Sequence, residues 1–536
     1  MSALKLCVIL KAGVAGPGER RFLRAVGEDA RFDLAVVAAC PAPEPSLPTI
    51  WRGWIAAETR LFPAPDDLPP DVPPPRDFAP DLAEGCDVVV DFSMSRAAEN
   101  CAPAARFGLW RLSTYDEASG LTEARLRSPV TEVALTCRTE EGEATIATAR
   151  FDTKFMASRN AAFAREKSVL LLLRELVRLT RDGALPAPVP APATLPAPRG
   201  VDLADYACAL TWELAMRVVR RIEAKRGKRP GMFFLRLSHG PLAGIDPTSG
   251  VDLMPPGNTY WADPFLLEHD GVTYLFYEDF DYATHHGHLS VGRLDGMRMD
   301  PIGPVMQMPH HLSFPYVFRW NGAVWMIPET HQAKRIELWR ATDFPLGWER
   351  AAVGFEGVEA SDTVVFEHAG QWWLATNIAN DSFGDFGSEL HLFTIDDPMM
   401  TNPQPHPLNP VVLDATTARN GGRIFAENGR LYRASQDNSN GVYGYGLNLM
   451  EITELSMTGY SERRVRHITP DAMPGIMGMH HMDAGGGYTV MDLRRSFTGQ
   501  HTSGRGKDQH ATAQEDGHED EPGDRDLYQR QAQSNF

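Results

Sequence analysis

The sequence predicts a multidomain protein, in which an N-terminal α/β domain of Rossmann-like layout precedes an all-β five-bladed propeller. Strand and helix patterns alternate at the start, a Pro/Ala-rich stretch follows, and one hairpin pattern then recurs five times. The predicted parts are the α/β domain, a linker, an amphipathic helix with its connector, the propeller and a disordered tail, at residues 1–183, 184–200, 201–234, 235–497 and 498–536.

The α/β domain is predicted from short apolar runs of the kind that form buried parallel strands. These runs are Leu4–Leu10, Phe32–Ala39 and Asp87–Asp91, and residues 19–26 favour a helix after the first run. The turn before that helix carries glycines at positions 13, 16 and 18. They fit either a phosphate cradle or a plain tight turn, because their spacing differs from GxGxxG.

Three further strands and a long helix complete this domain, at residues 108–112, 130–136, 144–149 and 161–181. With a strand that reads Gly-Leu-Trp-Arg-Leu and a later strand pair before a helix, the order resembles the N-terminal domain of formyltransferases. Those enzymes use an Asn, a His and an Asp to pass a formyl group from a folate. The first histidine of this chain is His239. We therefore do not expect formyl transfer by that route, and we interpret the domain as a retained scaffold or a binding module.

The segment Leu185–Pro198 is rich in Pro and Ala, which predicts a semi-rigid, extended linker. Residues 202–225 then show the period of an amphipathic helix. One side is apolar and the other largely basic, with Leu203, Tyr206, Leu210, Leu214, Val218 and Ile222 against Arg217, Arg220, Arg221 and Lys225. We expect this helix to pack on the rim of the propeller, and a basic helix of this kind also suits a membrane surface.

The propeller is predicted from the stretch Trp261–Glu278, which is an apolar run, a polar turn with a glycine and a second run rich in aromatic residues. Four more copies align with it, and the register is set by Gly271, Gly322, Gly370, Gly429 and Gly485. A third strand pattern follows each of the first four copies. A spacing near 50 residues is typical of propeller blades rather than of helical repeats.

The composition limits the partners of the chain. Its 70 acidic and 52 basic residues give a net charge of −18, which argues against nucleic acid and anionic membranes as main partners. Neither an apolar run of about 18 residues nor a signal-peptide pattern occurs, so we expect a cytoplasmic protein without a transmembrane segment, with peripheral contact to the inner membrane left open. The six cysteines are scattered without CxxC spacing, which disfavours disulfides and a zinc site.

In a propeller the innermost strand of each blade borders the central channel, so residues at its start converge on one mouth. Counted from the turn glycines, these residues are Asp263, Phe314, Asp362, Gly421 and Met477. The far ends of the second strands are all polar, with Glu278, Glu329, Asn377, Gln436 and Asp492. We expect the two aspartates of the first set to face each other across a cleft. The second set fits either solvated strand ends or a polar floor for a hydroxyl-rich ligand.

At Asp263-Pro264 and at Ser361-Asp362 the sequence resembles the five-bladed propeller glycosidases, including glycoside hydrolase family 43. The resemblance implies that Asp263 is the general base and that Asp362 tunes pKa values and orients the substrate. Blade four begins Arg419-Asn-Gly-Gly-Arg423, where the family carries its general acid. Inverting hydrolysis needs such an acid, and Glu329 is then the substitute. Glycosyl transfer from an activated donor needs only the base.

Residues 235–497 resemble more fully the propeller domain that precedes the transferase domain in plant glucosamine inositolphosphorylceramide transferase, and bacterial relatives fused to formyltransferase-like domains. The motifs that carry this resemblance are Trp261–Phe265, Ser313–Phe318, Ile327–Thr330, Arg433–Asp437 and Met479–Asp483. The separate transferase domain has no counterpart in this sequence. The resemblance implies a sugar or glycolipid substrate, with a nucleotide sugar as a candidate donor.

Three groups of neighbouring histidines occur, at residues 285–288, 310–311 and 480–481. Neighbours on a strand point to opposite faces, so such pairs do not suit one ion, and we expect no metal site and no required cofactor. The resemblance to the glycosidases implies that a last-blade histidine near the axis helps to hold calcium or a water cluster in the channel. His480 and His481 are the candidates for that role.

The sequence thus nominates Asp263, Asp362 and Glu329 as catalytic. The expected substrate-binding set is Trp261, Glu278, Asp279, Arg419, Asn420, Asp437, His480 and His481, with the tryptophan stacked on a sugar ring. The leading hypothesis is glycosyl transfer in glycan or glycolipid biosynthesis with Asp263 as base. One alternative is a hydrolase with Glu329 as acid, and another is a non-catalytic glycan-binding platform.

Overall fold

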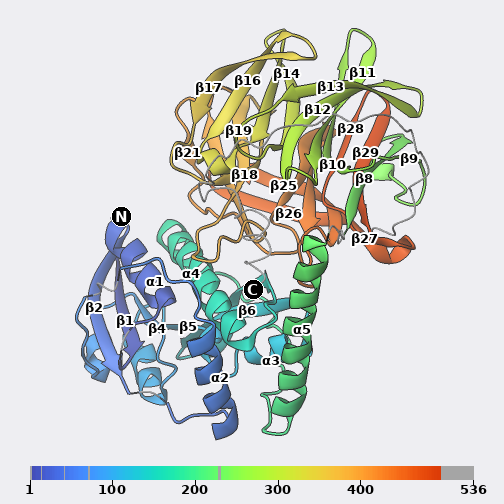
Figure 1. Ribbon diagram of the computed structural model, residues 1–536. Helices are drawn as coiled ribbons and strands as arrows, with labels where there is room; N and C mark the ends of the chain where they lie inside the picture. Colours follow the sequence, from blue (N-terminus) through green and yellow to red (C-terminus); the bar gives the residue numbers. More distant parts are fainter. Residues whose placement is uncertain (1–2, 14, 42, 70–72, 227–230, 497–536) are drawn as a thin grey trace, which may run out of the picture.

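The computed structural model describes residues 3–13, 15–41, 43–69, 73–226 and 231–496. Figure 1 shows an N-terminal α/β unit beside a ring of β-sheets. The predicted tail lies outside the described residues. Both predicted parts are therefore present, and the contacts between them are extensive.

A seven-stranded mixed sheet forms the centre of the N-terminal unit, in the order β3-β2-β1-β4-β5-β6-β7. The pairings among the first five of these strands are parallel, and the last two strands are added antiparallel. In chain order, β1 to β7 span Leu4–Lys11, Phe32–Cys40, Arg76–Asp77, Val88–Asp91, Leu109–Leu112, Val130–Thr139 and Gly142–Asp152. All four residues of β4 are buried, as expected of a strand covered on both faces.

Helices lie against this sheet, as Figure 1 shows in blue and teal. The α-helices are α1 Pro17–Glu28, α2 Thr49–Leu61, α3 Leu121–Leu126 and α4 Ala157–Asp182, and the 3-10 helices are η1 Pro80–Ala83, η2 Arg96–Ala104 and η3 Ser113–Tyr115. The predicted strands and helices of this unit are confirmed as a mixed α/β sheet with helices. Its Rossmann-like and formyltransferase-like assignment stays a prediction.

Helix α5, Asp202–Lys225, does not pack on the propeller rim as we expected. Leu203, Tyr206 and Leu210 are buried in a cluster with Trp51 and other residues of the N-terminal unit. The Tyr206 hydroxyl donates a hydrogen bond to Glu58 and accepts one from the Ala157 amide, each at 2.8 Å. These partners all lie in the N-terminal unit, so the helix belongs to it. Among the described residues, no helix has both the length and the apolar composition of a membrane span.

Five sheets form the predicted five-bladed propeller. The first four blades are β10 to β13, β14 to β17, β18 to β22 and β23 to β26. In chain order their strands span Thr259–His269, Val272–Asp281, His286–Asp295, Arg298–Met306, Ser313–Trp320, Ala323–Glu329, Ile336–Asp343, Gly347–Gly354, Ala360–His368, Gln371–Ile378, Glu389–Ile395, Gln404–Pro405, Val412–Leu413, Asn420–Glu427, Arg430–Asp437, Gly446–Ser456 and Gly459–Ile468.

The fifth blade joins the two ends of the propeller sequence. Its late strands are β27 Ile476–Gly478, β28 Met482–Gly485 and β29 Tyr488–Arg495, and β29 pairs with β8, Met232–His239, which is followed by β9, Val251–Leu253. Short 3-10 helices η4 Leu242–Gly244, η5 His331–Ala333 and η6 Pro470–Ala472 lie between strands. This pairing closes the ring and leaves no open seam between first and last strands. The sequence pattern did not predict this closure, and the predicted boundary at residue 235 falls inside β8.

The hairpin of the fifth blade differs from the predicted register. Gly485 pairs with Tyr488, so the turn is formed by Gly486 and Gly487 rather than by Gly485. Three consecutive glycines made the turn position ambiguous in the sequence, because each can adopt positive φ. Met477, placed at the channel mouth by that register, instead lies in β27 with 45% of its surface exposed.

A bulge recurs at the start of the innermost strand in the first three blades. The strand register shifts there, and Asp263, Phe314 and Asp362 adopt φ values of 49°, 47° and 51°. Left-handed backbone costs on the order of 1 kcal/mol or more in residues other than glycine, and bulges redirect side chains out of the usual alternation. The equivalent positions predicted from the repeat therefore share an unusual conformation as well as a place in the blade.

The N-terminal unit and the propeller are joined by buried charges. Lys167 of α4 is fully buried, with its Nζ 2.9 Å from Asp381 and 3.3 Å from Asp385 and also bonded to Glu389. Burial disfavours the charged amine, but these carboxylates raise the pKa of Lys167, which therefore stays protonated. Isolated buried charges are costly, so the lysine and the blade-three acids need one another.

Candidate functional site

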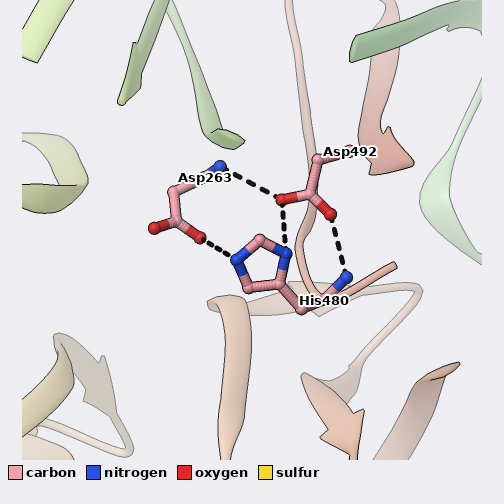
Figure 2. Close-up of side chains that lie close together, drawn as sticks. All are labelled: Asp263, His480 and Asp492. Atoms are coloured by element: carbon pink, nitrogen blue, oxygen red, sulfur yellow. Dashed lines mark hydrogen bonds and ion pairs between the residues drawn. The ribbon is translucent and has the colours of Figure 1, made fainter. Parts of the chain in front are cut away.

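Asp263, His480 and Asp492 meet where the first blade adjoins the last (Figure 2). His480 Nδ1 lies 2.8 Å from Asp492 Oδ2, and its Nε2 lies 3.3 Å from Asp263 Oδ1. The backbone N–H groups of His480 and Asp263 donate to Asp492 at 2.8 and 3.1 Å. All three side chains are buried. The imidazole is thus held between two carboxylates, with one of them also fixing the backbone around it.

The charges of this group differ from one residue to the next. Burial raises the pKa of Asp263 to about 6, against the attraction of His480 and with the help of negative charge on Asp492 and Glu329. Burial opposes the charged form of His480, yet Asp492 and Asp263 raise the pKa of the imidazole above its usual value. Burial also opposes ionisation of Asp492, but His480 holds the pKa of that carboxyl low. Asp263 is therefore the member poised to exchange a proton near neutral pH.

Asp362, which the sequence paired with Asp263, is engaged by an arginine. Arg419 Nε donates to Asp362 Oδ2 at 2.7 Å, and Arg419 Nη2 donates to Ser361 Oγ at 3.0 Å. The first residue of the unusual blade-four start thus neutralises the blade-three aspartate. Burial raises the pKa of Asp362 well above its usual value against the attraction of Arg419, and the charges of Glu329 and Asp263 add to the rise. Asp362 suits positioning and charge tuning better than proton transfer.

Glu329 is unsuited to the role of acid that the sequence suggested. Its carboxylate accepts hydrogen bonds from the Asp362 amide at 3.2 Å and from the Ser361 hydroxyl, and lies 2.8 Å from His331 Nδ1. Burial by itself raises the pKa of Glu329. His331 and Arg419 lower that pKa by a larger amount, so the net shift is downward. A carboxyl that stays ionised cannot donate a proton to a leaving group.

Glu278 has the opposite character. It accepts a hydrogen bond from the Tyr260 hydroxyl at 3.0 Å and lies 3.4 Å from His311 Nε2. Burial, reinforced by the nearby charge of Asp263, raises its pKa well above the usual value. Glu278 pairs in register with Ala262, one residue from Asp263. Burial thus favours the protonated form of a carboxyl that lies on the partner strand of Asp263.

The polar column at the far ends of the second strands is neither solvated nor an open floor. Its five members are buried, and three of them hold the backbone of the next blade. Glu329 accepts from the Asp362 amide, Asn377 from the Asn420 amide at 2.9 Å, and Asp492 from the Asp263 amide. At these three positions of the repeat, a side chain is hydrogen-bonded to the backbone of the next blade. Glu278 and Gln436 differ, because Glu278 makes side-chain contacts and Gln436 donates to the Asn420 carbonyl of its own blade at 2.9 Å.

Several expected substrate-binding residues do not join the Asp263 group. Trp261 is 6% exposed and packs against Tyr277 in the core, because the bulge at Asp263 breaks the strand alternation that would have put both side chains on one face. Asp279 lies 3.8 Å from His288 on the other side of β11 from Glu278. Asp437 lies 2.8 Å from His467 within blade four.

Asn420 and His481 are structural neighbours of the site. The Asn420 side chain donates to the Asp362 carbonyl at 2.9 Å and so joins blades three and four. His481 packs edge-on against Phe265 and Phe314, with ring centroids at 4.5 and 5.3 Å. Burial lowers the pKa of His481 to about 3, which keeps the ring neutral. Of the expected binding set, His480, Arg419 and Glu278 have direct contacts that suit a functional role.

Tyr443 was not predicted from the sequence. Its ring lies under the Arg419 guanidinium at 4.9 Å and edge-on to His480 at 5.3 Å. The loop that carries it, residues 438–445, is held by the N-terminal unit, because Asp152 accepts from the Gly441 amide and Pro129 from the Asn440 amide, each at 2.9 Å. The loop follows the fourth hairpin and lies outside the repeated sequence pattern. The repeat therefore could not predict its role.

The residues present do not fit the calcium ion that the glycosidase resemblance implied. Asp263, His480 and Asp492 bring one donor atom each within 4.8 Å of one another. This set supplies two carboxylates and one imidazole, whereas calcium prefers six to eight oxygen ligands. We therefore assign no chemical step to a metal.

A cavity of about 530 Å³ lies in the N-terminal unit beside the glycine turn. Residues of that turn, Phe92–Met94 after β4 and Phe383 of the propeller contribute to its walls. The Glu19 carboxylate lies over the turn, where it interacts with the amides of Gly16 and Glu19 itself, and burial raises its pKa. The amides that a phosphate would use are thus already engaged, which favours the tight-turn interpretation.

Comparisons with known proteins agree with the propeller assignment. Residues 248–484 match the family model described as glucosamine inositolphosphorylceramide transferase 1, N-terminal. The glucosamine inositolphosphorylceramide transferase 1 of Oryza sativa subsp. japonica is 33% identical over 261 residues, 46% of this chain and 34% of the relative. That of Arabidopsis thaliana is 35% identical over 218 residues, 39% of this chain and 28% of the relative. The resemblance of the propeller to these transferases is confirmed.

The chain spans about a third of the length of the curated relatives it matches. Among solved structures, a family 117 glycoside hydrolase of the marine bacterium Zobellia galactanivorans is 14% identical, with a TM-score of 0.33 over 49% of this chain and 91% of that chain. A likeness at that level carries no argument about function. The formyltransferase-like resemblance of the N-terminal unit stays a prediction.

Proposed function

We propose that the propeller binds a sugar beside Asp263 and catalyses glycosyl transfer in glycolipid or surface-glycan biosynthesis. The observation that carries this proposal is the Asp263 carboxyl, with a pKa of about 6, held by His480 and Asp492. Similarity to proteins named glucosamine inositolphosphorylceramide transferase 1 supports the substrate class. A cytoplasmic location at the inner membrane, where a lipid acceptor is reached, belongs to the same proposal.

Asp263 acts as the base in this reaction. The acceptor hydroxyl forms a bond to the anomeric carbon of the donor, and its proton moves to Asp263 Oδ1 or Oδ2. The bond from that carbon to the donor phosphate breaks, and the phosphate leaves with its negative charge, so no general acid is needed. A nucleotide sugar is the expected donor. The positive charge of His480, held by Asp492, stabilises the ionised base before transfer.

A glycoside hydrolase of the same fold is the second candidate, and Glu278 favours it. The raised pKa of Glu278 gives the site the protonated carboxyl that hydrolysis requires, a role that Glu329 cannot fill. In that case Glu278 protonates the leaving oxygen and Asp263 acts on water or on the anomeric carbon. The sequence alternative survives in this corrected form, with a different acid.

One assay separates these functions. The full chain is incubated with nucleotide sugars and lipid extracts, and in parallel with aryl glycosides, and products are followed by mass spectrometry. Consumption of a nucleotide sugar with a mass gain on a lipid supports transfer, and aryl release supports hydrolysis. If neither occurs while the chain binds immobilised glycans, the catalytic proposal is wrong and the propeller is a binding platform.

A further inference from the structure

Helix α5 has two apolar faces, and one of them is exposed. The first face packs on the N-terminal unit through Leu203, Tyr206 and Leu210. Round the helix from this face, Val218 is 59% exposed and Ile222 44%, and Trp212, opposite Leu203, is 65% exposed. Figure 1 shows α5 along the outer side of the N-terminal unit. A helix with apolar residues on both sides is expected to be covered on both sides.

The exposed face follows a seven-residue repeat. Counting every seventh residue gives exposed Val201, Cys208, Ala215 and Ile222. Ala204, Thr211 and Val218 are exposed as well, and each follows one of the first three of these residues at a distance of three positions. Six of these positions lie within α5 and follow the a and d spacing of a coiled-coil seam without a charged residue. Val201 precedes the helix, and the next d position, Lys225, is charged. A single surface helix has no need of such a seam.

The charges beside the seam are divided between the two ends of the helix. Asp205 borders the seam and is exposed in the first turn, whereas Arg221 and Arg226 border it and are exposed near the C-terminal end. Arg220 lies on the side away from the seam, 3.8 Å from Glu213. Two copies of α5 lying antiparallel bring the acidic end of each helix to the basic end of the other. A parallel arrangement would set like charges together. The surface is therefore complementary to itself under a two-fold axis.

We propose that α5 pairs with α5 of a second copy of this chain, as an antiparallel two-helix interface. Residues 498–536 of the same chain carry only Leu527, Tyr528 and Phe536 as large apolar residues, so that segment offers no matching stripe. An anionic membrane is a poorer occupant, because Asp205 borders the seam and the chain has a net charge of −18. Helix dipoles also oppose each other favourably in antiparallel pairs.

The oligomeric state of the full chain tests the proposal. Sedimentation velocity is measured over a concentration series for the wild type, for Ile222→Glu and for Ile302→Glu. Ile302 is a matched control, because it is 41% exposed on the outer strand of blade one, against 44% for Ile222. We expect two chains per particle for the wild type and for Ile302→Glu, and one chain for Ile222→Glu.

Cys208 supplies a second readout, since it is the one exposed cysteine of the six, all of which are described. Its reaction with a maleimide should slow at least several-fold at concentrations where the wild type is dimeric, and not in Ile222→Glu. Asp205→Arg should weaken the dimer, and adding Arg226→Asp should restore it. Failure of that restoration would overturn the antiparallel arrangement.

A wild type that stays a single chain up to concentrations on the order of 100 µM overturns the pairing. Flotation with vesicles of phosphatidylcholine and phosphatidylserine then tests whether a membrane, rather than a second copy, covers the seam. If those vesicles carry the wild type and not Ile222→Glu, the seam belongs to a membrane. If Ile222→Glu remains a dimer, the interface lies elsewhere and the proposal is also wrong.

Discussion

The Nε2 atom of His480 lies 3.3 Å from Oδ1 of Asp263, so a residue of the last blade acts on the charge of a residue of the first. The two positions are far apart in the chain and meet because β29 pairs with β8 and closes the ring. This contact joins the charges of His480 and Asp492 to the carboxyl that we propose as base. The predictions on catalysis start from it.

Replacing Asp263 by Asn should remove at least about 99% of any turnover, because the amide cannot take the acceptor proton. The measurement is kcat/KM for the transfer or hydrolysis found in the assay above. Asp279→Asn is the matched control, since Asp279 lies on the same strand pair but contacts His288. Retained turnover in Asp263→Asn would show that another group is the base.

The activity should fall as the pH drops through about 6, because the base must be ionised and burial raises the pKa of Asp263 to about 6. The pH dependence of kcat/KM reports this group in the free enzyme. Glu278 should add a falling limb at high pH if hydrolysis occurs, since that reaction needs its proton. A profile flat between pH 5 and 7 would contradict the assignment of Asp263.

Asp263 should also destabilise the fold above its pKa. Its folded pKa of about 6 exceeds the ordinary 3.8, so its contribution to stability is full below about pH 4 and is lost as the pH rises through 6. Asp263→Asn should therefore be more stable than the wild type by up to about 3 kcal/mol at pH 7 and equal to it near pH 4. Urea unfolding of both proteins across this range measures the difference, and a constant difference would refute the linkage.

Glu278→Gln should separate the two catalytic candidates. The substitution keeps a hydrogen-bonding group opposite Tyr260 but removes the proton that hydrolysis needs. Transfer from a nucleotide sugar should then change less than tenfold, whereas release of a poor leaving group should drop at least a hundredfold. Glu329→Gln serves as comparison and should not show this split. Equal losses in both reactions would mean that Glu278 has a structural role.

Lys167→Met should destabilise the protein by about 3 to 5 kcal/mol, because three blade-three carboxylates lose the buried charge that compensates them. The surface pair of Lys334 and Glu359 offers the control, with the lysine side chain 61% exposed. Lys334→Met should cost less than about 1 kcal/mol. Thermal unfolding measures both, and similar values for the two variants would show that the junction does not depend on this charge.

Asp152→Ala should loosen the loop that carries Tyr443, because the Gly441 amide loses its acceptor. Hydrogen exchange of a peptide over residues 438–446 should speed up by roughly fivefold, as expected for one lost hydrogen bond of about 1 kcal/mol. Asp182→Ala, at the exposed end of α4, is the control. Unchanged exchange in Asp152→Ala would show that the N-terminal unit does not hold this loop.

Most of the fold could be predicted from the sequence, because strands and hairpins are local. The turn glycines from Gly271 to Gly429 mark hairpins whose paired residues lie at most 22 positions apart, as between Thr259 and Asp281, and periodicity reports such pairing directly. The strands of the N-terminal sheet could be predicted equally well from their apolar runs. The fifth turn was misplaced at Gly485. The closing strand β8 was missed because its partner β29 lies more than two hundred residues away in the sequence.

The site was only partly predictable. Repetition alone identified Asp263 and Asp362 as equivalent positions, and the resemblance suggested the first as base. The structure disfavours Glu329 as acid, because burial of that carboxyl is outweighed by His331 and Arg419, which approach it only in the folded ring. Trp261 was misassigned because a bulge interrupts the alternation that sequence reasoning assumes.

The sequence by itself determined the repeat, the number of blades and the identity of the acidic positions, since these follow from local pattern and chain order. The tertiary structure alone decided which carboxyl favours its protonated form, which carboxyl is hydrogen-bonded to the next blade, and which carboxyl faces His480. Protonation and exposure are set by burial and by charges brought close in space, and neither is encoded at a fixed distance along the chain.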